Sequence, residues 1–194
     1  MIRMNGGLSR TKKITYTSMM IALAVTLRLI KYVLFGNLQF VNFPGVFTLI
    51  SGILFGPVIG TTVGFASYLL SDMLLGMPGP WTVVNSILMA ALGLTSGIIW
   101  SRKDKTKISR TGIGIGAYML MFVFDILASG FLFVIIGMQW TTAFISGLIG
   151  LLLPGISGGY LIAVGPITEA TTAILTVMIV HALIKGSKKI NAVS

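Results

Sequence analysis

The amino-acid sequence predicts an all-α integral membrane protein that forms a single membrane domain over residues 1–194. Hydrophobic residues make up 55% of the chain and charged residues only 9%, with a mean hydropathy of +0.98. Apolar runs recur along the whole sequence, whereas the flanks at 1–13 and 187–194 are too short to bury a core. Most of the net charge of +10 lies in three basic clusters beside these runs, which indicates membrane orientation rather than nucleic-acid binding.

The basic clusters predict the direction in which the chain crosses the membrane. Lys and Arg concentrate in cytoplasmic loops, so both termini and the loop at 102–110 are expected in the cytoplasm. An even number of crossings must therefore separate each cluster from the next. The clusters are Arg10, Lys12 and Lys13; Arg102, Lys103, Lys105, Lys107 and Arg110; and Lys185, Lys188 and Lys189.

Four crossings are expected before the middle basic loop. The first run is long enough for a hydrocarbon core that needs roughly 20 residues, whereas the second is short for a full crossing. Gly56-Pro57 separates the second run from the third, and the stretch at 76–80, rich in glycine and proline, forms a hairpin tip before the fourth. The expected helices are 14–35, 43–55, 58–75 and 81–100.

Two further crossings complete a six-helix bundle. An almost uninterrupted apolar run predicts a helix at 111–136, and the last helix is expected at 167–184. The segment between them, 141–166, is apolar but contains many glycines, so it is predicted to form an irregular, partly helical extracellular lid. An additional pair of crossings in this segment, which would give eight, is the alternative.

Five ionisable side chains are predicted to lie in the outer half of the membrane. Arg28, Asp72 and Asp125 each follow the expected cytoplasmic end of their helix by fourteen residues, or about 21 Å. Lys31 lies one turn further out, and Glu169 lies near the outer start of the last helix. A charge at the bilayer centre costs about 2.5–3.5 kcal/mol, so these groups need partners. Two interpretations stay open: an ion-pair network that holds the helices together, and such a network around a bound polar ligand.

Polar and aromatic residues accompany these charges. Tyr118, Asp125 and Ser129 recur at helical spacing on one face of the fifth helix, and the hairpin after Asp72 brings Trp81 and Asn85. An alternative function is a proton- or sodium-coupled secondary transporter that uses Asp72, Asp125 or Glu169. The absence of cysteine, the single histidine and the lack of a hydrolase or metalloprotease motif argue against an enzyme or a metal site.

Small residues recur every four positions on three helices. Gly60 and Gly64 share one face of the third helix, and Gly93 and Gly97 share one face of the fourth, a spacing that lets helix backbones approach closely in lipid. These two stripes are expected to close the bundle. A further stripe on the first helix, which closes the bundle or docks another membrane subunit, consists of Ser18, Ala22 and Thr26.

These features together resemble the substrate-binding S components of energy-coupling factor (ECF) vitamin transporters. The resemblance rests on chain size, six crossings with both ends inside, the stripe on the first helix and the run LISGILFGPVIGTTVGFASYLLSD at 49–72. The family's Ala-x-x-x-Ala docking motif corresponds here to Ala22 and Thr26, preceded by Ser18. The Gly-Pro-Trp at 79–81 is most similar to the cobalamin-type members, while riboflavin, pantothenate and queuosine-precursor specificities remain open.

The resemblance implies a high-affinity binder without enzymatic activity in a prokaryotic cell membrane. It would capture a vitamin from outside, topple within the membrane to release it, and partner a transmembrane coupling subunit and two cytoplasmic ATPases. No cofactor is expected in this chain, which has no phosphate-binding loop, so ATP would be used by the partners. The residues expected to bind ligand are Arg28, Lys31, Asp72, Trp81, Asn85, Asp125 and Glu169, with Asn42, Gln139 and Trp140 at the rim.

Overall fold

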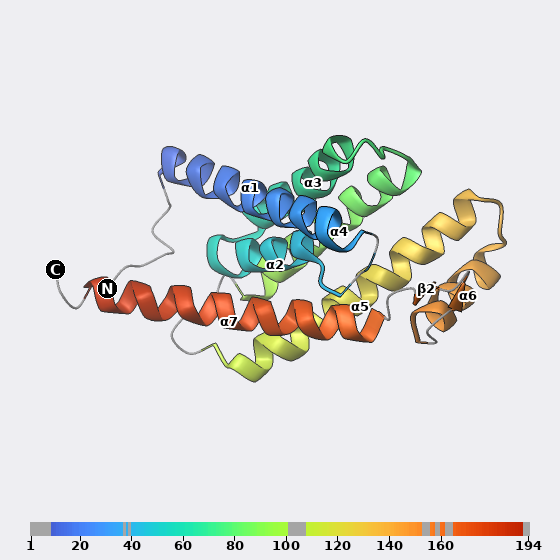
Figure 1. The fold of residues 1–194 in the computed structure, drawn as a ribbon. Coiled ribbons are helices and arrows are strands. Elements are labelled where there is room, and N and C mark those ends of the chain that lie inside the picture. The colour runs from blue at the N-terminus through green and yellow to red at the C-terminus, as the bar shows by residue number, and fades with distance from the viewer. Residues whose placement is uncertain are drawn as a thin grey trace.

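A computed structural model describes residues 9–36, 38, 40–100, 108–152, 156–157, 160–161 and 165–191. The described residues are almost entirely helical, and each of the six predicted helices is present, with ends within four residues of expectation except the last helix, which extends seven residues further (Figure 1). The helices are α1 (Arg10–Phe35), α2 (Phe43–Phe55), α3 (Pro57–Leu74), α4 (Pro80–Trp100), α5 (Arg110–Ile135), α6 (Trp140–Leu152) and α7 (Gly165–Asn191).

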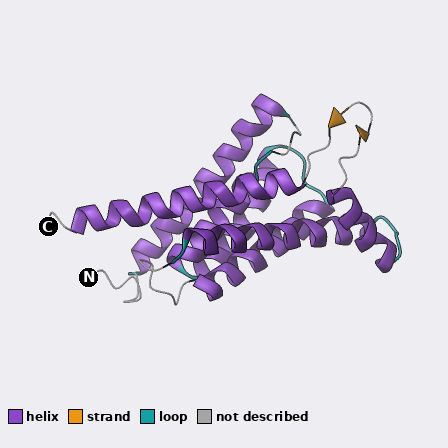
Figure 2. Ribbon diagram, turned by 90° about the horizontal axis from the view of Figure 1, so that it is seen from below, coloured by secondary structure: helices purple, strands orange, loops and turns teal. Residues whose placement is uncertain are grey.

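The segment predicted to form an irregular, partly helical lid contains one regular helix in its first half, which agrees with the partly helical expectation. Helix α6 has 13 residues and packs against α5. Its glycines do not break it, because Gly147 faces α5, where a Cβ would lie 3.2 Å from the Cβ of Ser129. Two short antiparallel strands follow, β1 (Ile156–Ser157) and β2 (Tyr160–Leu161), and they lie apart from the helices in Figure 2. The remainder of the predicted lid lies outside the described residues.

Local sequence signals set several helix ends. The side-chain oxygens of Ser9, Asn42 and Ser109 accept backbone N–H groups in the first turns of α1, α2 and α5. Between α2 and α3, Gly56 has a φ of 101°, a conformation that glycine adopts without steric cost, and Pro57 begins α3. The predicted break at Gly56-Pro57 is therefore confirmed.

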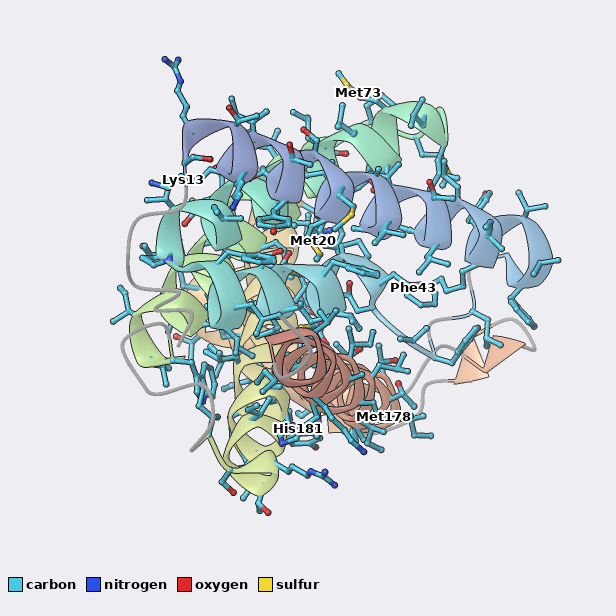
Figure 3. The ribbon with its side chains drawn as sticks, turned by 90° about the vertical axis from the view of Figure 1, so that its left-hand side faces the viewer. Lys13, Met20, Phe43, Met73, Met178 and His181 are labelled. Carbon is cyan, nitrogen blue, oxygen red and sulfur yellow. The ribbon has the colours of Figure 1, made fainter. Side chains whose placement is uncertain are left out.

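Helix α2 lies at the centre of the bundle, in contact with α1, α3, α4 and α7. Nearly all of its residues are buried, although its 13 residues are fewer than a membrane span requires. The first turn of α1 and the last turn of α7 lie at the same end of the molecule (Figure 1). Figure 3 shows Met20 of α1 turned toward the interior and Met73 and Met178 on the outside, in agreement with their exposed fractions of 4%, 59% and 61%.

Helices α3 and α4 pack glycine against glycine, as the two stripes predict. A Cβ on Gly60 would lie 2.6 Å from the carbonyl oxygen of Gly93, and a Cβ on Gly93 would overlap the carbonyl of Gly60. Gly64 faces the backbone of Met89, and Gly97 faces that of Pro57 in the same way. These contacts leave no room for a side chain, so they set the distance between the two helices.

Four of the helices are long and apolar enough to cross a membrane: α1, α4, α5 and the part of α7 from Gly165 to Gly186. Helix α3 has 18 residues and is not among these four. The chain is therefore a multi-pass membrane protein by length and composition. The prediction of six crossings stays a prediction, as does the lid function of the segment after α6.

Candidate functional site

A cavity of about 310 Å³ is lined by residues from the second half of α1, the start of α2, the second half of α5 and the start of α7. Its walls include the aromatic rings of Tyr68 and Phe124, whose centroids are 6.0 Å apart, and polar side chains from several helices. This mixture of aromatic surface and a few converging polar groups is typical of small-molecule sites. The lining residues are Arg28, Lys31, Val41, Asn42, Phe43, Pro44, Tyr68, Asn85, Phe124, Asp125, Ala128, Ser129, Leu132, Leu151, Gly165 and Thr168.

Arg28 forms the cationic wall of the cavity with a side chain held by α3. Its guanidinium pairs with Asp72 at 2.5 Å, donates to the hydroxyl of Ser71 and lies 4.6 Å from the ring centroid of Tyr68. Asp72 is buried and also accepts a hydrogen bond of 2.7 Å from Thr82 of α4. Asp72 does not line the cavity itself. Its carboxylate therefore orients Arg28 and ties α1 to the hairpin between α3 and α4.

Lys31 and Asn42 lie next to Arg28 along the cavity wall. Lys31 is only 5% exposed, and its amino group donates to the carbonyl oxygen of Val41 at 3.4 Å. Asn42 caps α2 by accepting from the Gly45 N–H at 2.9 Å and donates to the Tyr68 hydroxyl at 2.9 Å. Most of the hydrogen-bonding capacity of Asn42 is thus engaged within the protein.

Helix α7 holds the turn between α1 and α2 in place. The hydroxyl of Thr172 accepts the backbone N–H of Asn42 at 3.0 Å, and the hydroxyl of Thr171 donates to the carbonyl oxygen of Phe40. Figure 3 marks Phe43, where the chain enters α2 after this turn. These bonds place the turn beside the cavity.

The opposite wall of the cavity is acidic. Asp125 of α5 lines it and is partly buried, and Glu169 of α7 lies behind it with no exposed surface. The two carboxyl groups interact electrostatically with each other, and the phenol of Tyr118 lies beside Glu169. The cavity therefore has cations on the α1 side and carboxyl groups on the α5 and α7 side, an arrangement suited to a ligand with different polar edges.

Five of the predicted ligand residues line this cavity: Arg28, Lys31, Asn42, Asn85 and Asp125. Asp72 and Glu169 support the wall from behind.

Three further residues predicted to bind ligand lie away from the lining. The indole of Trp81 is 45% exposed, donates to the carbonyl oxygen of Met77 at 3.0 Å and folds over Gly79 at the hairpin tip. Gln139 and Trp140 are exposed at the start of α6, where the indole of Trp140 stacks on Phe144 with centroids 6.1 Å apart. These contacts are structural, so a ligand role for these three residues stays a prediction.

Several lining residues were not singled out as ligand residues from the sequence. The positions of Tyr68 and Ser129 could have been found from the sequence, since each lies one helical turn from an ionisable residue of a membrane helix, Asp72 and Asp125 respectively. Nothing in the sequence distinguishes Phe43 and Phe124 as ligand residues, because apolar residues are expected everywhere in a membrane helix.

The proposed docking stripe faces outward. Ser18, Ala22 and Thr26 are all exposed on α1, whereas Met20, Ala24 and Val25 point into the bundle. The stripe is therefore available to another helix, and the bundle is closed by other contacts.

Comparison with known proteins identifies the family of this chain. The family model described as ECF-type riboflavin transporter, S component, matches residues 9–189, which is nearly the whole chain. No curated protein and no solved structure matches the chain significantly. ECF S components bind a vitamin and work with a membrane coupling subunit and ATPases. The chain belongs to the ECF-type riboflavin transporter S component family, whose members are substrate-binding subunits of transporters and not enzymes.

Proposed function

We propose that this protein captures riboflavin or a flavin-sized heterocycle in the cavity between α1, α5 and α7. The observation that carries the proposal is a cavity of about 310 Å³ lined by three aromatic residues, Phe43, Tyr68 and Phe124, and by charges of both signs. The isoalloxazine ring of riboflavin is flat, with carbonyl acceptors and an N–H donor at one edge. Aromatic side chains can stack on such a ring, while charged groups bind its polar edges.

The size of the cavity favours a flavin over a cobalamin. Small-molecule sites occupy about 300–1,000 Å³, and a volume of about 310 Å³ lies at the lower end of that range. A cobalamin, with its corrin ring and nucleotide tail, is several times larger than a flavin. The match to the riboflavin-type family supports the same choice.

Removing a charge from either wall is expected to weaken riboflavin binding. Lys31→Met and Asp125→Asn should each raise the Kd roughly ten- to a hundred-fold, because a hydrogen bond to a charged group contributes about 1.5–3 kcal/mol. Titration of the purified protein, followed by the quenching of flavin fluorescence, measures this. Lys185→Met, which removes an exposed lysine on α7 away from the cavity lining, should bind like the wild type. Unchanged affinity in both charge variants would contradict the assignment of the cavity.

The same subunit is proposed to dock on its coupling subunit through the stripe of Ser18, Ala22 and Thr26. Small exposed residues at this spacing allow close approach of a partner helix. Both termini are proposed to face the cytoplasm of a prokaryote, because the first turn of α1 and the last turn of α7 lie at one end together with basic residues. Two cytoplasmic ATPases would then act from that side, and the subunit would topple to release the vitamin.

Ala22→Leu is expected to spare riboflavin affinity and reduce uptake by the assembled transporter at least ten-fold. The added side chain would keep the partner helix at a distance without reaching the cavity. Uptake of labelled riboflavin into cells or vesicles that contain the complete transporter measures the effect. Ala91→Leu is the matched control, because Ala91 is also exposed but lies on α4. A loss of affinity in Ala22→Leu, or full uptake by this variant, would refute the docking surface.

A further inference from the structure

Glu169 is the most deeply buried charged side chain in the described part of the protein. It lies in the second turn of α7 with 0% of its surface exposed, and neither carboxylate oxygen accepts a hydrogen bond from any described residue. A Cβ on Gly165, one turn earlier, would lie 3.3 Å from Oε1 of Glu169, so the side chain is closely surrounded. A buried carboxylate without hydrogen bonds is costly and requires a compensating group.

The polar groups that face Glu169 do not supply that compensation. The carboxyl of Asp125 and the phenol of Tyr118, both on α5, are its hydrogen-bonding neighbours, but neither of them makes a well-formed hydrogen bond to a Glu169 oxygen. On α1, the guanidinium of Arg28 pairs with Asp72, and the amino group of Lys31 donates to the carbonyl oxygen of Val41. Two facing carboxylates repel each other strongly where water is excluded.

We propose that Asp125 and Glu169 together hold one monovalent cation, either Na⁺ or a proton. One positive charge between the two carboxyl groups removes their repulsion, and the phenol oxygen of Tyr118 lies beside the same place. The partial positive charge at the start of α7 favours a remaining negative charge there. A divalent ion fits poorly, because Ca²⁺ takes six to eight oxygen ligands, and the described residues contain no group of three or more His, Cys, Asp or Glu side chains.

The cation site is linked to the cavity through Asp125, which belongs to both. The bound cation therefore sets the charge of the acidic wall and with it the affinity for a ligand. This linkage rests on the proposed function, whereas the cation site itself does not, so the site is tested on protein without vitamin.

Na⁺ binding is tested by thermal unfolding of the vitamin-free protein in detergent. Replacing choline chloride by NaCl at constant ionic strength should raise the Tm by about 2–4 °C, because a ligand that binds only the folded state stabilises it. Glu169→Gln and Asp125→Asn keep the side-chain shapes and should lose this rise. Asp104→Asn, a carboxylate replacement within the basic segment of the sequence at 102–110, should keep it.

The proton is tested by infrared spectroscopy on the same proteins. If the wild type shows no response to Na⁺, it should show the carbonyl band of a protonated carboxyl group, and this band should disappear in Glu169→Gln or Asp125→Asn but persist in Asp104→Asn. A rise of the Tm in NaCl identifies the bound cation as Na⁺. The carbonyl band of a protonated carboxyl group identifies it as a proton. The absence of both signals in the wild type, or their persistence in both variants of the pair, would overturn the proposal.

A riboflavin titration then separates this inference from the proposed function. With Na⁺ as the occupant, riboflavin affinity should change at least five-fold between NaCl and choline chloride in the wild type and not in Glu169→Gln. With a proton as the occupant, the same change should follow pH. A cation signal without riboflavin binding at any condition would contradict the proposed function and leave the cation site standing. A riboflavin affinity that changes neither with Na⁺ nor with pH would refute the linkage between the cation site and the cavity.

Discussion

Replacing Gly93 with alanine is expected to destabilise the folded protein strongly. The new Cβ would overlap the carbonyl of Gly60 and would also lie 2.9 Å from Cγ2 of Thr48, so α3 and α4 would have to separate. Backbone atoms cannot move aside as a flexible side chain can, and overpacking of well-packed helices costs about 1–3 kcal/mol or more. The shift of this interface would also displace Thr82, which binds Asp72. Thermal unfolding in detergent and gel filtration of the purified variant measure the loss.

The matched control is Gly186→Ala, in the last turns of α7. Gly186 is helical and exposed, and a Cβ there would meet nothing within 4 Å. Alanine should leave stability unchanged or raise it slightly, because glycine in a helix is less favourable than alanine by about 1 kcal/mol. If Gly93→Ala is as stable as the wild type, the close approach of α3 and α4 is wrong.

Breaking the ion pair between Arg28 and Asp72 is expected to have the second-largest effect. Asp72→Asn leaves the guanidinium of Arg28 without its counter-charge in a site where the two side chains are only 19% and 3% exposed. Removing one partner of a buried pair costs about 3–5 kcal/mol, because the remaining charge stays desolvated. Since Arg28 also lines the cavity, riboflavin affinity should fall with stability. Thermal unfolding and riboflavin titration on the same preparation measure both.

A double-mutant cycle distinguishes the pair from its separate residues. The double variant Arg28→Met and Asp72→Leu removes both charges, so it should be more stable than either single variant. Relative to the single variants, the double variant should regain stability but not riboflavin affinity to the same extent, because the cavity has lost the guanidinium of Arg28. Additive losses of stability would show that the two residues do not act as a pair.

The membrane architecture could be read from the sequence, and the glycine motifs show why. Hydrophobic runs of known length specify helices through local composition alone, so the six predicted helices agree with the structure within four residues at every end except the last, where the polar end of α7 extends to Asn191. Gly60 and Gly93 could be assigned to helix contacts because only small residues allow backbones to touch. The segment of α6 was predicted only as partly helical, and the extent of this helix could not be predicted, since its glycines signal a break unless the neighbouring helix is known.

The sequence predicted which residues lie near the candidate site, but not which of them pair with one another and which face the cavity. The depth of Arg28, Asp72 and Asp125 along their helices follows from counting residues, which brings them to one level of the membrane. Which carboxylate then binds Arg28 depends on how each helix is rotated and packed. Asp72 pairs with Arg28, and Asp125 faces the cavity.

The sequence by itself therefore determined that this is a multi-pass helical membrane protein with charges gathered at one depth and small residues at the helix contacts. Only the tertiary structure decided that Arg28 is held by Asp72, that Trp81 lies outside the cavity lining and that Glu169 lies buried behind Asp125. The physical reason is that hydropathy and residue spacing act along one helix, whereas the partner of a buried charge is set by the angles and distances between helices.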